Sequence, residues 1–212
     1  MKHSINQTLF AYWNDVRQDR PAPRRFEIEP SQIAAILPNT FILERVDSET
    51  FRFRLGGTSL CEIFRKELRE TNFIAAFDES DHSTVERLLT SVTLHCGVGT
   101  LDIETSTNDG RTATFEILLL PLVHTHGSID RVLGSIAPKE SPDWLGAEDL
   151  ASWQLLASKV IWPDGRALPS MDSLQRQAPF MPHIRKARIV RSERRQFRVY
   201  DGGLTKSPSN ET

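Results

Sequence analysis

Residues 51–64 read FRFRLGGTSLCEIF, and two structural periods meet within them. The first five residues alternate strictly between apolar and basic side chains, which is the pattern of a β-strand with one face in a core. Two glycines then end the strand, and Leu60, Ile63 and Phe64 follow at the three-to-four spacing of a helix face. This stretch predicts a strand that leads through a glycine turn directly into a helix.

The segments on both sides predict an antiparallel sheet. Before the stretch, residues 40–46 are a strand candidate, and the turn Asp47-Ser48-Glu49 makes a hairpin with the strand that follows. After it, residues 81–94 are a helix candidate, in which Asp81-His82-Ser83-Thr84 offer N-capping side chains and apolar residues then follow at helical spacing. Further strand candidates are residues 100–107, 112–122 and 131–136. Five strands with helices inserted after the second predict an α+β fold, in which an antiparallel sheet has helices packed on one face.

Composition divides the chain into four parts. We predict an N-terminal helical segment and linker at 1–39, the sheet domain at 40–143, an apolar extension at 144–182, and a basic tail at 183–212. The first part includes an amphipathic helix, and the third is expected to pack on the core or on a partner. The tail holds eight Lys and Arg against three acidic residues, although the whole chain has a net charge of −2.

Composition also restricts the class of protein. The chain is 39% hydrophobic, which allows a core, but no apolar run is long enough to cross a bilayer. The N-terminus has no apolar signal-peptide segment, and the two cysteines are too few for a disulfide-stapled fold. We therefore expect a cytoplasmic protein without a membrane span.

An ordered set of short segments runs through the chain: Tyr12-Trp13, Pro21-Ala22-Pro23, Ile36-Leu37-Pro38, Phe41-Ile42-Leu43, residues 53–61, residues 64–68, residues 118–122 and Arg131-Val132-Leu133-Gly134. Between about residues 8 and 146, this set resembles the stand-alone PAS-domain proteins that are abundant in alphaproteobacteria. The chain departs from that pattern at Arg65, where the family tends to have glycine. The resemblance implies a PAS-like sheet and cytoplasmic signalling through contact with other regulators, and it implies no particular ligand.

A curved sheet covered by short helices is expected to leave a space between the two layers, and concave apolar spaces are the usual small-molecule sites. The residues that we expect there are core residues first and ligand contacts second: Phe53, Leu55, Leu60, Phe64, Phe73, Leu88, Val92, Phe115 and Ile117.

The sequence contains no recognisable catalytic, metal or cofactor motif, and this favours binding over catalysis. Cys61 and Cys96 lack the Asn-Cys-Arg context of a flavin photosensor, and the histidines at the ends of the 81–94 helix fit caps better than haem ligands. His124 and His126 lack a third metal ligand nearby. No phosphate loop or nucleophile elbow occurs. We predict no catalytic residues, no metal site, and neither haem nor flavin, with the ligand unknown.

The basic tail carries the motif Arg-x-x-x-Arg twice, through Arg191, Arg194, Arg195 and Arg198. This spacing resembles the arginine pair with which PilZ domains bind cyclic di-GMP, and guanidinium groups suit phosphates. A solvated tail, an acidic protein partner, a nucleotide and DNA all stay open, although no DNA-reading motif supports sequence-specific binding.

These observations favour a non-enzymatic sensor or adaptor that regulates signalling by binding small molecules, regulatory proteins or both. A homodimer is expected, because a symmetric pair is the usual way to cover apolar flanking segments. The alternatives are a cyclic di-GMP effector or a nucleic-acid binder that works through the tail.

Overall fold

The computed structural model describes residues 1–124 and 127–163. Its helices are α1 (Ser4–Arg17), α2 (Thr58–Phe64) and α3 (His82–His95). Its short 3-10 helices are η1 (Arg25–Glu27), η2 (Pro30–Ile33), η3 (Leu37–Asn39), η4 (Ile74–Ala76) and η5 (Glu79–Asp81). Its strands are β1 (Thr40–Arg45), β2 (Phe51–Gly56), β3 (Val98–Ser106), β4 (Thr112–Leu122), β5 (Arg131–Pro138) and β6 (Gln154–Ile161). None of these helices is long and apolar enough to span a membrane.

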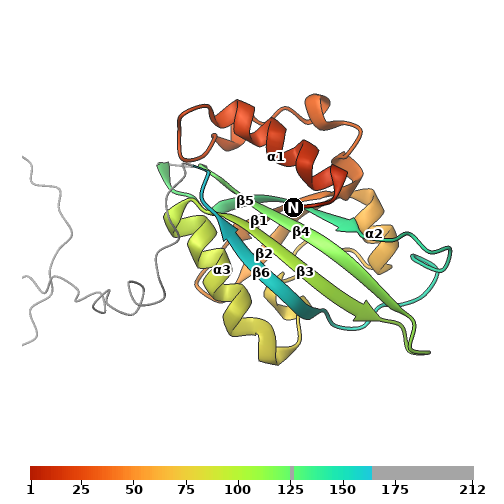
Figure 1. Cartoon of the computed structure of the whole chain (residues 1–212). Helices are drawn as coiled ribbons and strands as arrows, with labels where there is room; N and C mark the ends of the chain where they lie inside the picture. The colour runs from red at the N-terminus through yellow and green to blue at the C-terminus, as the bar shows by residue number, and fades with distance from the viewer. Residues whose placement is uncertain (125–126, 164–212) are drawn as a thin grey trace, which may run out of the picture. The chain divides into compact units, whose positions relative to one another are not determined.

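The strands form one antiparallel sheet in the order β2-β1-β5-β4-β3-β6 (Figure 1). The predicted α+β, PAS-like fold is confirmed, and within the described residues the sheet has six strands where five were expected. The additional strand, β6, lies in the predicted apolar extension and pairs along β3, from Val98 opposite Ile161 to Glu104 opposite Gln154. The extension therefore contributes a strand to the sheet.

The sheet is buried on both faces, and the sequence of β4 shows why. Its residues from Phe115 to Leu122 are all buried and have no polar alternation except at Glu116. Phe115, Ile117 and Leu119 join the core cluster beneath α2 and α3, whereas Leu118, Leu120 and Leu122 join a second cluster beneath α1. Figure 1 shows α1 and α3 on opposite sides of the sheet. We call the α3 side the inner face and the α1 side the outer face.

α1 is fixed to the outer face by its apolar side. Leu9 and Trp13 are fully buried, and the indole nitrogen of Trp13 donates a hydrogen bond to the carbonyl of Pro121 at 3.0 Å. A buried indole usually finds such a partner. The N-terminal segment thus covers the face that the sheet would otherwise leave bare.

After Pro30, the N-terminal segment forms the short turns η2 and η3. The turn η3 lies beside the start of α2, where Gly57 allows a very close approach. A Cβ atom at Gly57 would lie 2.1 Å from the carbonyl oxygen of Pro38, so any larger residue there would push the two segments apart.

Candidate functional site

Eight of the nine residues expected to line a ligand space lie together in the inner core. Phe53, Leu60, Phe64, Phe73, Leu88, Val92, Phe115 and Ile117 are each at most 5% exposed and belong to one cluster. Their role as ligand contacts stays a prediction, because the same burial describes a plain core.

Aromatic side chains pack closely in this cluster, and one of them comes from the extension. Trp153, which is 1% exposed, directly precedes β6. Its ring centroid lies 5.0 Å from that of Phe64, 5.3 Å from Phe77 and 5.8 Å from Phe73. Such edge and tilted contacts add to the stability that burial alone supplies. Trp153 therefore fills space between the helices and the sheet.

Leu55 is the exception, and its placement in the inner core was wrong. The side chain is 53% exposed. β1 pairs Leu43 with Phe53 but Ile42 with Leu55, so the register shifts by one residue at Arg54. A bulge of this kind reverses the alternation of side chains beyond it. Leu55 consequently faces the outer side, next to Ile42.

Leu55 instead lines a pocket on the outer face, which we call the outer pocket. Its volume is about 400 Å³. One wall comes from the N-terminal segment through Arg25, Ile28, Pro30, Ile33, Ala34, Leu37 and Pro38. The other comes from β1, β2, β5 and the start of α2 through Thr40, Phe41, Ile42, Leu55, Gly56, Gly57, Thr58 and Leu133. Most of this lining is apolar, which suits an apolar ligand.

Of the residues that the structure describes, Arg25 is the one charged residue in that lining. Its backbone is held in place, because its amide nitrogen donates to the carbonyl of Val123 at 2.7 Å. Among the described residues, none forms an ion pair or a hydrogen bond with the Arg25 guanidinium. The outer pocket thus combines an apolar body with one uncompensated positive charge.

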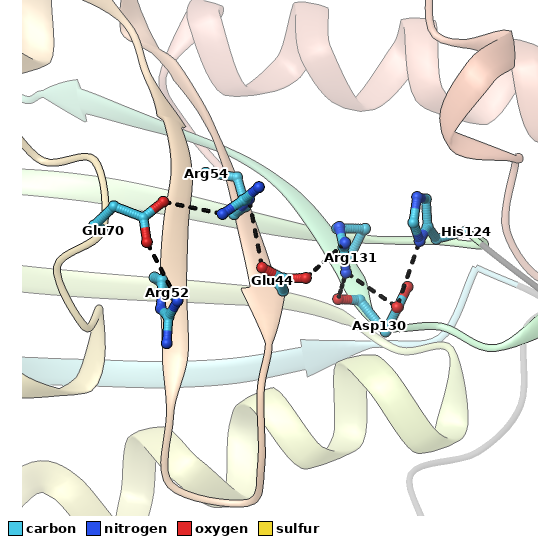
Figure 2. Close-up of polar contacts among 7 residues, drawn as sticks. All are labelled: Glu44, Arg52, Arg54, Glu70, His124, Asp130 and Arg131. Atoms are coloured by element: carbon cyan, nitrogen blue, oxygen red, sulfur yellow. Dashed lines mark hydrogen bonds and ion pairs between the residues drawn. The ribbon is translucent and has the colours of Figure 1, made fainter.

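A row of alternating charges crosses β2, β1 and β5 on the outer face of the sheet (Figure 2). Glu70 contacts Arg52 and Arg54 at 3.2 and 2.9 Å, and Arg54 reaches Glu44 at 3.4 Å. The row continues through Arg131, whose guanidinium lies 2.7 Å from the Glu44 carboxylate and 3.0 Å from that of Asp130.

His124 ends this row with its Nδ1 atom 3.5 Å from an Asp130 carboxylate oxygen. The carboxylates of the row already have basic partners, and none of them lines the outer pocket. These ion pairs therefore link neighbouring strands, and their carboxylates do not pair with Arg25.

A buried polar cluster joins α1 to β4. Glu116 is 4% exposed, and its carboxylate accepts hydrogen bonds from the Asn6 side chain at 2.8 Å and from the backbone amide of Lys2 at 2.7 Å. Ser135 donates to the other side of the Asn6 amide at 2.7 Å. Burial acts to raise the pKa of Glu116, but these hydrogen bonds outweigh it, and the pKa lies below its ordinary value.

The other side chains considered for chemistry are dispersed. Cys61 lies in α2, with its sulfur 4.0 Å from Glu67, and Cys96 caps α3. The ring of His82 contacts the Phe77 carbonyl at 3.0 Å. Within residues 1–124 and 127–163, no three His, Cys, Asp or Glu side chains are placed to hold a metal ion. His126 and the four tail arginines, Arg191, Arg194, Arg195 and Arg198, lie outside the described residues.

The absence of a haem or flavin site stays a prediction from sequence. The outer pocket, by contrast, had no signal in the sequence, because it is formed by three short turns and a strand whose register shifts. Arg25 could have been singled out only as one of two adjacent arginines in a proline-bounded linker.

Comparison with known proteins gives one family match. A family model described as "PAS domain" matches residues 1–137. Among solved structures, the chain is similar to one described as "Flavin Analogue Sheds Light on Light-Oxygen-Voltage Domain Mechanism", with 19% identity and a TM-score of 0.37, over 55% of this chain and 90% of that chain. No curated protein matches the sequence.

Proposed function

The chain belongs to the PAS domain family, and from that premise we propose that it is a non-enzymatic sensor or adaptor of cytoplasmic signalling that binds a small molecule in the outer pocket. In this proposal, occupancy of the pocket controls contact with a regulatory protein partner. The narrower likeness to alphaproteobacterial stand-alone members stays a prediction from sequence.

One observation carries the proposal: the walls of the outer pocket belong to two separate parts of the chain. Ile33 and Leu37 come from the N-terminal segment, whereas Ile42 and Leu133 come from the sheet. A ligand between them binds best when the two parts are close together, so it shifts the population of states toward that arrangement. A pocket of this construction can turn binding into a change in the position of the N-terminal segment.

The packing of the inner core supports this choice of site. In the space between the sheet and its helices, the Trp153 ring contacts the rings of Phe64, Phe73 and Phe77, and Phe73 also contacts Phe77. A ligand there would have to displace well-packed aromatic rings, which contribute strongly to core stability. The outer pocket needs no such displacement.

An uncharged fluorescent probe, N-phenyl-1-naphthylamine, tests the proposal. We expect saturable fluorescence enhancement with the wild-type protein and its loss in Ala34→Phe, since Ala34 lines the pocket and a phenyl ring there fills it. Ala35→Phe is the matched control, because Ala35 is an exposed neighbour that does not line the pocket. Equal enhancement in both variants, or no saturable signal with the wild-type protein, would contradict the proposal.

A further inference from the structure

We propose that the natural ligand class of the outer pocket is a small amphiphilic carboxylate, whose hydrocarbon body lies in the apolar lining and whose carboxylate pairs with Arg25. This inference rests on the proposed function of the pocket and adds the chemistry of what it recognises.

The charge of Arg25 supports an anionic ligand. The charged side chains nearest to Arg25 in the sequence have other partners: Arg24 lies over the ring of Phe26, at 5.8 Å, and Glu27 is held by Arg20 at 2.9 Å. Glu27 also accepts a hydrogen bond from the backbone amide of Arg24 at 2.7 Å. Glu27, the acidic residue nearest to Arg25 in the sequence, is therefore already paired. The Arg25 guanidinium is available to pair with the acidic group of a ligand.

A carboxylate fits this charge better than a phosphate group does. One guanidinium matches one carboxylate through two parallel hydrogen bonds. A phosphate dianion would need further donors, but the part of the chain that the structure describes gives the lining no second basic residue, and its other polar side chains there are the hydroxyls of Thr40 and Thr58. The Thr40 hydroxyl already donates to the Leu37 carbonyl at 2.9 Å.

The lining determines the rest of the ligand. Ile28, Ile33 and Leu133 are nearly fully buried around the pocket, and Leu37 and Leu55 flank it with partly exposed side chains. Such a surface gains from covering hydrocarbon and offers few partners to the hydroxyls of a sugar or a nucleoside. A volume of about 400 Å³ suits a small molecule.

Calorimetry with octanoate and octan-1-ol, two probes of equal chain length, tests the inference on the full chain. We expect octanoate to bind the wild-type protein more tightly than octanol does. Arg25→Gln should weaken octanoate binding about tenfold or more, the size expected for loss of a hydrogen bond between charged groups. Octanol binding should be unchanged in this variant, which shows that the pocket remains intact. Arg24→Gln is the matched control and should bind both probes as the wild-type protein does.

Failure of the inference is distinguishable from failure of the proposed function. If octanoate and octanol bind equally well, or Arg25→Gln leaves octanoate binding unchanged, recognition of a carboxylate is wrong, while the pocket remains a binding site. If neither probe binds, the inference is wrong, and the naphthylamine experiment decides whether the proposed pocket function is wrong as well.

Discussion

Arg65 adopts a backbone conformation that usually belongs to glycine. It caps the C-terminus of α2 with φ 50° and ψ 32°, in the left-handed region. Its side chain reaches residues beyond β5: Nε lies 2.9 Å from the Asp149 carboxylate, and another guanidinium nitrogen donates to the Ala147 carbonyl. The glycine that the sequence resemblance predicts at this position would relieve backbone strain, and arginine instead gains a tie between α2 and the extension.

Substitution at Arg65 separates these two effects. Arg65→Ala loses the tie and retains the strain, whereas Arg65→Gly loses the tie and relieves the strain. We therefore expect the glycine variant to be more stable than the alanine variant by about 1 kcal/mol in urea denaturation. The ion pair itself is exposed and should contribute little. An alanine variant as stable as the glycine variant would show that the left-handed conformation carries no strain here.

Glu116 provides a pH-dependent attachment for α1. Its pKa is lowered below the ordinary value of 4.5, so its contribution to stability is present above pH 4.5 and is lost as the pH falls through the folded-state pKa. Glu116→Gln places an amide where backbone N–H groups need an acceptor, and we expect a loss of about 1–3 kcal/mol at pH 7.

Urea denaturation at a series of pH values checks this expectation. The difference between the wild-type protein and Glu116→Gln should shrink as the pH falls from 4.5 through the lower folded-state pKa, because the wild-type carboxyl becomes protonated over that range. Glu104→Gln, a half-buried position on β3, is the control and should show a small difference at every pH. A Glu116→Gln effect that does not depend on pH would mean that the carboxylate charge is irrelevant to the attachment.

At the scale of elements, β6 does more than extend the sheet. It covers the edge of β3, and the residue before it, Trp153, completes the inner aromatic cluster. The start of β6 is also attached to η5, because the Asp81 carboxylate accepts a hydrogen bond from the Leu155 amide at 2.8 Å. Asp81 was expected as an N-cap of α3, and its side chain makes no capping hydrogen bond there.

Removal of the Trp153 ring should leave a cavity in the inner core. We expect Trp153→Ala to lower the free energy of unfolding by about 3–5 kcal/mol, the usual cost of a large aromatic deletion. Indole should raise the melting temperature of this variant by filling the cavity and leave the wild-type protein unaffected. Leu156→Ala, at a half-exposed position of the same strand, should cost little. A small loss for Trp153→Ala would show that the ring is not part of the core.

Elements with a regular spacing of apolar side chains were predicted correctly from the sequence. Features at which that spacing is interrupted were missed. The predicted strand at 112–122 matches β4, since its apolar run and flanking turn are unambiguous. Leu55 was misplaced because a bulge depends on how β2 pairs with β1, which alternation within one strand does not reveal. β6 was read as a general apolar extension, because an edge strand with one half-buried face has a weak pattern. The outer pocket depends on the bulge, which turns Leu55 outward, and on the turns of the N-terminal segment.

At the scale of the whole described molecule, the two faces of the sheet have different roles. The inner face holds the aromatic cluster, whereas the outer face carries α1, the charge row and the outer pocket. The N-terminal segment around the pocket is made of short turns with few ladder hydrogen bonds, and such segments open more readily than sheet strands do. In the proposed function, ligand binding at the pocket therefore acts on this segment without disturbing the core.

Hydrogen exchange followed by mass spectrometry checks this division. Saturating octanoate should slow amide exchange in residues 28–42 and at the start of α2, because a ligand stabilises the closed arrangement of the segments that it contacts. Exchange in β3 and β4 should be unaffected. Ala34→Phe, which fills the pocket, should show no change on addition of octanoate. Protection confined to the inner helices would place the ligand in the core instead.

The packing of Trp153 in the inner core matters for the preparation of shortened forms of this chain. The region that matches the family model stops at residue 137, before the tryptophan and the strand that follows it. A fragment trimmed to that boundary would expose the unpaired backbone of β3 beside a hollow lined with phenylalanine, which are the features that promote precipitation during expression. The smallest soluble fragment should therefore extend through Ile161.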